Sequence, residues 1–266
     1  MKFFSLIRDL SYRKYKYGWF GNYSSWEDAK KDSVGYDSDL ILENVKNSLL
    51  KVKNGEAIYE RDSVLFDKVE YSWPLLAALL WIAVKNRGKL NLIDFGGSLG
   101  STYFQNRSFL KDLSELHWNI IEQEMFVECG KSYFEDDHLK FYFNLDECIA
   151  QQNPDVIILS SVLQYIESPY ELLSKIIGLN LSYIIFDITS FLEHGEDRIT
   201  VQKVPPQIYN ATYPAWFFEK KKFIDFFKGK YELIAEFEAY VGKEYYIENN
   251  IKAGDKGFIF RRIKDA

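Results

Sequence analysis

The spacing of apolar residues changes once along the chain. Its first part is mostly helical in pattern: Ser25 precedes an acidic turn that can open a helix, residues 39–52 are amphipathic, and Pro74 stands in the first turn of a strongly apolar stretch. We therefore predict a helical N-terminal cap or extension over residues 1–88.

Short apolar runs separated by helical or loop segments follow in residues 89–266, which is the pattern of a parallel α/β sheet. We predict strands at residues 90–95, 118–122, 139–143, 155–160, 183–188, 231–240 and 256–263. The first five alternate with segments long enough for crossover helices, whereas no helix is evident between the last two. An antiparallel final pair on an otherwise parallel sheet is expected.

A long segment, residues 189–230, separates the fifth and sixth predicted strands and carries prolines and a group of aromatic residues. Long insertions at the carboxyl ends of parallel strands usually build the ligand crevice. We expect this insertion to form the wall that binds the substrate.

A glycine-rich turn follows the first predicted strand. Asp94 lies near the end of that strand, and Gly96, Gly97 and Gly100 precede a helix start. Glycine lets the backbone turn sharply or approach a ligand where a Cβ would collide. A dinucleotide fingerprint would need glycine in place of Phe95, so the pattern favours another nucleotide or a purely structural turn.

A carboxylate ends the second predicted strand. Glu122 lies 22 residues after Gly100, a spacing typical of the acid that binds ribose hydroxyls in nucleotide-binding sheets. The alternative is a surface glutamate at a strand end. The glycine turn in the same sheet favours the ribose role.

These features, together with residues 154–169 around the fourth strand, resemble the motifs of class I S-adenosylmethionine-dependent methyltransferases. The resemblance implies a Rossmann-like α/β fold, with a mostly parallel seven-stranded sheet and an antiparallel last strand. It implies S-adenosylmethionine as cofactor, bound by Asp94, Gly96, Gly97, Gly100, Glu122, Asp146, Ser160 and Ser161. Many relatives carry histidine at the position of Tyr165, so a histidine base is not expected there.

Three further segments, residues 17–23, 197–202 and 213–218, resemble a methyltransferase family often encoded among bacterial genes for surface polysaccharide (O-antigen or capsule) synthesis. The resemblance extends from about Tyr17 to Arg262. It implies a class I fold and S-adenosylmethionine, and it does not supply the substrate; we expect a small-molecule or lipid-linked sugar as the methyl acceptor.

Methyl transfer from a sulfonium needs an in-line approach and little covalent help, although an oxygen acceptor can require a base. His194, just after the fifth strand, is the first candidate, followed by Tyr165 and Asp187. An exposed loop position is the alternative for His194.

Candidate acceptor-binding residues lie in the insertion. Arg198 can hold a phosphate or carboxylate with its planar fork, or pair with a nearby acid such as Glu196 or Asp197. Gln202, Tyr213 and Trp216 complete the candidate set; the aromatic rings can stack on a sugar or pack the insertion onto the sheet.

Charge and cysteine content narrow the function classes. A formal net charge of -6 argues against a protein that works by neutralising nucleic-acid phosphates. Cys129 and Cys148 form no C-x-x-C pair, which favours reduced thiols and a cytoplasmic protein. His117 and His138 lack metal-ligand spacing, so no metal is expected.

The first 20 residues mix basic and apolar positions without the apolar run of a signal peptide or membrane span. Their pattern fits a terminal helix on the domain and also weak peripheral contact with an anionic membrane surface.

Three functions remain open at this point. The leading one is methyl transfer to a sugar hydroxyl, amine or carboxylate. The second is a cofactor-binding regulatory or interaction subunit without transfer activity. The third, a nucleotide-sugar oxidoreductase, is disfavoured by Phe95 and by the lack of a Tyr-x-x-x-Lys pair after the fourth strand.

Overall fold

A computed structural model describes residues 17–35, 38–205, 211–242, 244–248 and 251–263. The chain divides into two compact units. Unit 1 comprises Met1–Asp37, Ser161–Asn180 and Phe186–Ala266, and unit 2 comprises Ser38–Ser160 and Leu181–Ile185. This division differs from the predicted boundary at residue 88, because a strand near the N-terminus pairs with the insertion after the fifth predicted strand.

Unit 2 contains the parallel strands that carry the glycine turn. Its elements are α3 (Ser38–Lys53), β2 (Tyr59–Arg61), β3 (Val64–Phe66), α4 (Trp73–Lys85), β4 (Lys89–Phe95), α5 (Ser101–Leu110), β5 (Glu115–Ile121), α6 (Glu124–Tyr133), β6 (Leu139–Tyr142), α7 (Leu145–Gln151), β7 (Val156–Ser160) and the start of β8 (Tyr183–Leu192). Strand β4 pairs in parallel with β5 and β7, and β5 pairs in parallel with β6. The strand order is β6-β5-β4-β7-β8.

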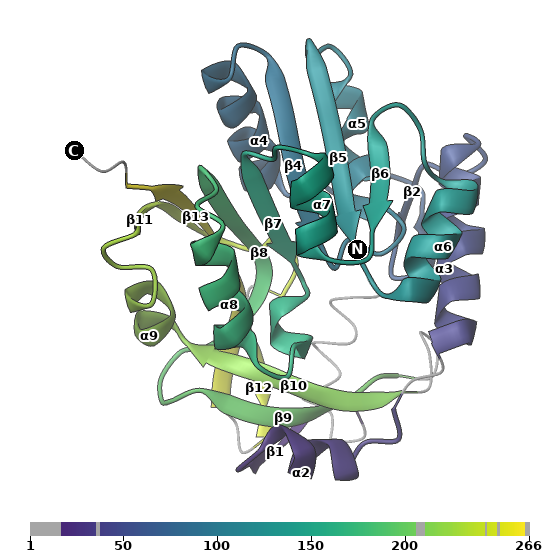
Figure 1. The fold of residues 1–266 in the computed structure, drawn as a ribbon. Coiled ribbons are helices and arrows are strands. Elements are labelled where there is room, and N and C mark those ends of the chain that lie inside the picture. Colours follow the sequence, from purple (N-terminus) through teal and green to yellow (C-terminus); the bar gives the residue numbers. More distant parts are fainter. Residues whose placement is uncertain (1–16, 36–37, 206–210, 243, 249–250, 264–266) are drawn as a thin grey trace. The chain divides into compact units, whose positions relative to one another are not determined.

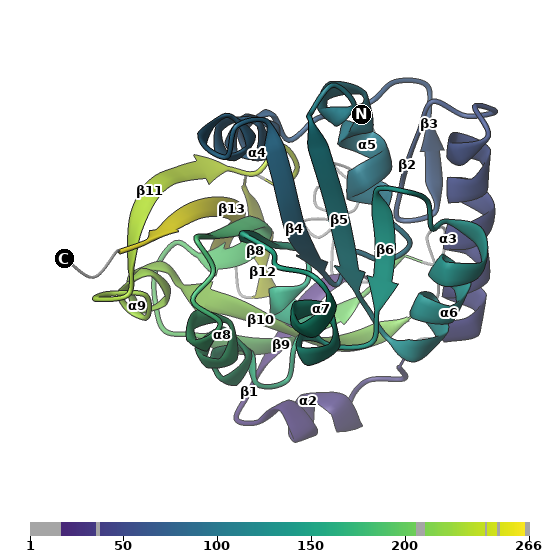
Figure 2. The same cartoon turned by 45° about the horizontal axis from the view of Figure 1, so that its top comes forward.

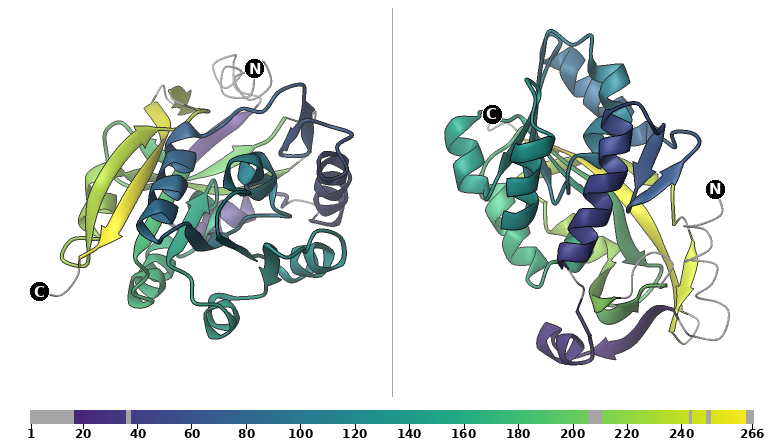
Figure 3. Two further views of the ribbon diagram at one scale, coloured as in Figure 1. Left: turned by 90° about the horizontal axis from the view of Figure 1, so that it is seen from above. Right: turned by 90° about the vertical axis from the view of Figure 1, so that its right-hand side faces the viewer.

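The helices of unit 2 cover both faces of these strands. Figure 1 shows α4 and α5 behind the strands and α7 in front of them. Burial on both faces explains why the strand sequences are almost continuously apolar. The hairpin β2–β3 lies beside α3, as Figures 2 and 3 show from two further directions.

Unit 1 contains the remaining elements. They are β1 (Gly18–Tyr23), α2 (Trp26–Lys31), the 3-10 helix η1 (Leu163–Tyr165), α8 (Pro169–Gly178), the rest of β8, β9 (Arg198–Lys203), β10 (Thr212–Glu219), α9 (Lys220–Asp225), β11 (Tyr231–Glu238), β12 (Tyr245–Ile247) and β13 (Ile251–Arg262). The strand order β1-β9-β10-β8 combines antiparallel pairs with a short parallel contact between β10 and β8. Strand β13 also pairs with β8 and is antiparallel to β11.

Phenylalanine forms much of the core of unit 1. The side chains of Phe186, Phe191, Phe223, Phe227, Phe258 and Phe260, which come from β8, β13 and the segment around α9, are at most 1% exposed. The rings of Phe227 and Phe260 stack with centroids 4.3 Å apart. Packing of the core therefore explains part of the high aromatic content, and these rings are not needed to bind a ligand.

Three local expectations are corrected. Residues 18–20 belong to strand β1 and not to an N-terminal helix, because they pair with β9; residues 1–16 lie outside the described residues. The segment before residue 88, predicted to be mostly helical, also contains the hairpin β2–β3. Strand β8 continues to Leu192, beyond the predicted start of the insertion at residue 189.

All seven predicted strands are present, and the antiparallel final pair β11–β13 is confirmed. The succession β6-β5-β4-β7-β8, with helices on both faces of its parallel strands, is the predicted Rossmann-like α/β arrangement. The described residues include no helix long and apolar enough to cross a bilayer.

Candidate cofactor and acceptor sites

The glycine turn of unit 2 connects β4 to α5 through left-handed backbone. Gly96, Ser98 and Gly100 have φ of 71°, 53° and 104°, and Gly100 is the N-cap residue of α5. Positive φ is nearly free for glycine and costly for most other residues. The turn therefore brings backbone N–H groups and the N-terminus of a 10-residue helix to the carboxyl end of β4.

Asp94 lies directly beneath this turn. Its side chain is only 1% exposed, and its Oδ2 accepts a hydrogen bond of 3.0 Å from the indole N–H of Trp118. Burial raises the pKa of Asp94 to about 7, the Trp118 hydrogen bond opposes the shift, and the negative charge of Glu122 adds to it. A Cβ on Gly97 would lie 2.6 Å from Cγ of Asp94, so this position requires glycine.

Glu122 meets the same turn from the end of β5. Its Oε1 accepts a hydrogen bond of 3.3 Å from the Ser98 N–H, and its Oε2 accepts one of 2.8 Å from the Gln123 N–H. Burial raises the pKa of Glu122. The structure thus brings together the predicted glycine turn and the predicted ribose-binding carboxylate within one unit.

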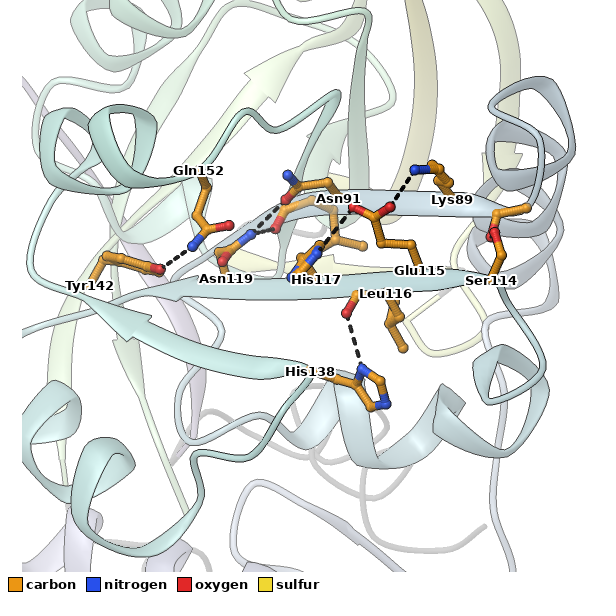
Figure 4. A network of polar contacts seen from close by, with 12 residues as sticks. Lys89, Asn91, Ser114, Glu115, Leu116, His117, Asn119, His138, Tyr142 and Gln152 are labelled. Atoms are coloured by element: carbon orange, nitrogen blue, oxygen red, sulfur yellow. Dashed lines mark hydrogen bonds and ion pairs between the residues drawn. The ribbon is translucent and has the colours of Figure 1, made fainter.

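A buried amide helps to hold β5 in register with β4. Asn119, which is fully buried, donates from Nδ2 to Oδ1 of Asn91 and to the carbonyl oxygen of Leu92, both at 2.9 Å (Figure 4). Strand register is strongly specified where a face of the strand is buried. This pair places the last residue of β5 beside the turn and Glu122 just after it.

Sequence reasoning missed a third carboxylate near the turn. Glu60 in β2 is 2% exposed and accepts hydrogen bonds of 2.7 Å from the hydroxyl of Ser101 and from the Ser63 N–H. Burial raises the pKa of Glu60 to about 7, against the effect of both hydrogen bonds. Glu60 therefore links the β2–β3 hairpin to the first residue of α5.

The other predicted cofactor residues lie at or just after the ends of two different strands: Asp146 comes after β6, and Ser160 and Ser161 lie at the end of β7. Asp146 is exposed in the first turn of α7, where Asn144 caps the helix by accepting from the Glu147 N–H. Ser160 ends β7 in unit 2 and is half-buried. Ser161 begins the next segment of unit 1 with φ of 56°.

His117 and His138 have structural neighbours in unit 2. His117 Nε2 lies 3.3 Å from a carboxylate oxygen of Glu115, and His138 Nδ1 contacts the carbonyl oxygen of Leu116 at 3.1 Å (Figure 4). The described residues contain no group of three or more His, Cys, Asp or Glu side chains able to hold a metal ion.

In unit 1, strand β9 presents two different faces. Ile199 and Val201 pack with Ala29 of α2 on one face. Arg198, Thr200 and Gln202 alternate with them and are also buried, at 9%, 0% and 9% exposure. We call the side of β1, β9 and β10 that carries these three residues the polar face, since side chains alternate between the two sides of a strand.

The polar face brings three predicted residues together. The hydroxyl of Tyr165 donates a 3.0 Å hydrogen bond to Oε1 of Gln202, and the rings of Tyr165 and Tyr213 meet edge to face with centroids 5.3 Å apart. Gln202 is the register partner of Tyr213 in β10 and of Trp19 in β1. A catalytic candidate and two acceptor candidates therefore form one contact cluster.

Trp216 lies apart from this cluster. Its ring packs on the opposite side of the strands, where it stacks with Trp26 at 6.3 Å, and its indole N–H donates to the carbonyl oxygen of Ile166. The prediction placed Trp216 with Gln202 and Tyr213. Trp216 lies three positions after Tyr213 in the strand, and an odd offset places the two side chains on opposite faces.

The other two catalytic candidates are also separate. His194 is exposed in the turn between β8 and β9, the alternative stated for it from the sequence. Asp187 is fully buried in β8, and its Oδ1 accepts from the N–H of Ile188, whose φ is 48°. A positive φ at a β-branched residue is a marked outlier.

Arg198 has neither of its predicted acidic partners. Asp197 accepts instead from the Glu219 N–H, from the hydroxyl of Tyr170 and from Nζ of Lys222. Nζ of Lys222 is 2.7 Å from the Asp197 carboxylate. Arg198 lies near Glu248 instead, a residue that follows β12 and that sequence distance gave no reason to select.

No protein-family model matches the sequence. A comparison with curated proteins finds no match either. Among solved structures, the N-terminal domain of EvdMO1, crystallised in the presence of SAH and D-fucose, is 11% identical; the alignment covers 86% of this chain and 98% of that chain, with a TM-score of 0.46. The magnesium protoporphyrin IX methyltransferase ChlM from Synechocystis PCC 6803, with bound SAM, is also 11% identical, with coverages of 85% and 96% and a TM-score of 0.46.

A third solved structure is SAM-bound CalS10, an amino pentose methyltransferase from Micromonospora echinaspora involved in calicheamicin biosynthesis. It is 11% identical, with coverages of 73% and 92% and a TM-score of 0.43.

Proposed function

We propose that the chain binds S-adenosylmethionine at the glycine turn of unit 2 and transfers its methyl group to a sugar-derived acceptor in surface polysaccharide synthesis. One observation carries the cofactor assignment. The carboxylate of Glu122 contacts the N–H of Ser98 within a left-handed turn that opens α5.

The residues of the turn suit this cofactor chemically. A carboxylate has about four lone-pair sites; Glu122 uses two of them for backbone N–H groups, which leaves acceptors for two ribose hydroxyls. Asp94 lies below the turn as a buried acid that can face a cationic group. The cofactor supplies an activated methyl on a sulfonium, and the protein residues bind and orient it.

The acceptor assignment rests on unit 1 and on the resemblance of its segments 17–23, 197–202 and 213–218 to the polysaccharide-associated family. Tyr165, Gln202 and Tyr213 combine a hydroxyl, an amide and two aromatic rings, which are common groups in sugar recognition. Tyr165 is the catalytic candidate that contacts this set. We assign it the role of orienting the acceptor.

Calorimetry with S-adenosylmethionine and with NAD tests the cofactor assignment. Glu122→Gln should weaken S-adenosylmethionine binding at least about tenfold, because a charged acceptor of hydrogen bonds is lost. Glu124→Gln, which removes an exposed carboxylate two residues away, is the matched control and should leave the affinity unchanged. Binding of NAD alone, or equal affinities in both variants, would refute the assignment.

Transfer itself needs a separate assay. Labelled S-adenosylmethionine incubated with a panel of lipid-linked and nucleotide-linked sugars should label at least one acceptor. Cofactor binding without labelling of any acceptor would favour a regulatory or interaction subunit instead.

A further inference from the structure

Arg198 and Glu248 are held by the same residue of unit 1. Nε of Arg198 donates a 2.8 Å hydrogen bond to the carbonyl oxygen of Gly21. The N–H of Gly21 donates to Oε2 of Glu248, and the same oxygen lies 3.7 Å from the terminal NH2 nitrogen of Arg198. Gly21 lies in the irregular part of β1 with φ of 82°, where β1 passes the first residue of β9.

In this arrangement the guanidinium group of Arg198 forms fewer hydrogen bonds than it can donate. A charge-assisted hydrogen bond between guanidinium and carboxylate is about 2.7–2.9 Å long, and a matched pair forms two of them. At 3.7 Å the Glu248 carboxylate is an ion-pair neighbour without a hydrogen bond. Within the part of the chain that the structure describes, the hydrogen bond of Arg198 is made by Nε, and its terminal nitrogens make none.

The two partners differ in burial. The side chain of Arg198 is 10% exposed, whereas that of Glu248 is 37% exposed. A nearly buried cation needs a partner, because desolvation of an unpaired charge is costly. A half-exposed carboxylate at this distance is a weak partner that solvent screens. Arg198 is therefore fixed in place, and Glu248 is the replaceable member of the pair.

Among the residues that the structure describes, no other charged group is paired with this fork. Asp197, the adjacent acid, is occupied by Tyr170, Lys222 and the Glu219 N–H. Tyr23, the other titratable group that senses Glu248, hydrogen-bonds to Asp32. The unused donors of Arg198 remain available to an outside oxyanion.

We propose that Arg198 binds a carboxylate or phosphate group of the methyl acceptor, and that Glu248 occupies this position until the oxyanion of the acceptor replaces it. The identity of the ligand as the methyl acceptor rests on the proposed function; the oxyanion site itself does not. The acceptor class is then an anionic sugar derivative, such as a uronate or a sugar phosphate. Two oxygens of a carboxylate or a phosphate fit the planar fork in the bidentate geometry that Glu248 does not reach.

Calorimetric titration with D-glucuronate and with inorganic phosphate tests the site without methyl transfer. Glu248→Gln removes the competing charge, while its amide oxygen can still accept from the Gly21 N–H. This variant should bind at least one probe about fivefold more tightly than the unaltered protein, the effect expected for loss of one partly exposed ion pair. Glu244→Gln removes a more exposed charge, one that pairs with Lys252, from the same segment and should change the affinity less than about twofold.

Arg198→Lys provides the complementary measurement. Lysine keeps the charge and a donor for Gly21 but lacks the fork, so probe binding should fall about tenfold. Equal affinities for Glu248→Gln and Glu244→Gln, or no binding of either probe to the unaltered protein and to Glu248→Gln, would overturn the proposal. Titration of the same variants with S-adenosylmethionine distinguishes the proposed function from the proposed oxyanion site. If S-adenosylmethionine does not bind, the proposed function is refuted, whereas the result for the oxyanion site is unaffected.

Discussion

Replacing Asp94 by asparagine should make unit 2 more stable at pH 8 and should weaken its proposed binding of S-adenosylmethionine. The Asp94 carboxyl is 1% exposed, and burial raises its pKa to about 7 from an ordinary value of 3.8. The folded state therefore holds the proton more tightly than the unfolded state does. The contribution of Asp94 to stability is greatest below about pH 4 and is lost as the pH rises through about 7.

The size of this loss of stability follows from the shift in the pKa of Asp94. One pKa unit corresponds to about 1.4 kcal/mol, so the burial of Asp94 costs about 4 kcal/mol at pH 8, where the carboxyl must ionise, and about 1–2 kcal/mol at pH 5, where it keeps the proton that the unfolded chain has lost. Asparagine cannot ionise, and its Oδ1 can still accept from the Trp118 indole. After an allowance for the cost of burying the amide, Asp94→Asn should be about 2–4 kcal/mol more stable than the unaltered protein at pH 8.

Urea unfolding at pH 5, 6.5 and 8 measures this difference. Asp112→Asn, at an exposed position, is the matched control and should have little effect at any of these pH values. The stability gain of Asp94→Asn should shrink toward pH 5, and calorimetry should show weaker S-adenosylmethionine binding despite the gain. A difference that is the same at pH 5 and pH 8 would refute the reasoning from burial of the carboxylate.

Two other substitutions test close contacts. Gly97→Ala places a Cβ 2.6 Å from Cγ of Asp94 and should cost about 1–3 kcal/mol of unfolding free energy. Gly178→Ala is the control, since a Cβ there meets nothing within 4 Å, and it should be neutral or stabilising. Similar urea midpoints for the two variants would contradict this prediction. Tyr165→Phe leaves the Oε1 of Gln202 without its hydroxyl donor and should cost about 1–3 kcal/mol. A double-mutant cycle with Gln202→Leu should show coupling between the two side chains, and strict additivity would show that the hydrogen bond contributes nothing.

Much of the fold was predictable because it depends on local pattern. Buried parallel strands are apolar on both faces, and the five runs that form β4 to β8 were found for this reason. The runs that form the antiparallel pair β11 and β13 were also found, and the boundaries of all seven differ by a few residues. The capping of α2 by Ser25, whose Oγ accepts from the Asp28 N–H, also follows from neighbouring residues.

The cofactor half of the candidate site was predictable for a related reason. In a parallel sheet, residues at the carboxyl ends of adjacent strands meet at one edge. The end of β4 and the residue after β5 therefore come together whatever the rest of the chain does, and the contact between Ser98 and Glu122 is the result.

The sequence by itself thus determined the sheet, the turn and its carboxylate. Only the tertiary structure decided which strand β1 joins, that Glu60 reaches Ser101, that Trp216 packs against Trp26, and that Glu248 is the neighbour of Arg198. These features depend on pairing between segments far apart in the chain and on which face of a strand points inward. Alternation along a strand shows which residues share a face, but the partners that cover each face are set by long-range packing.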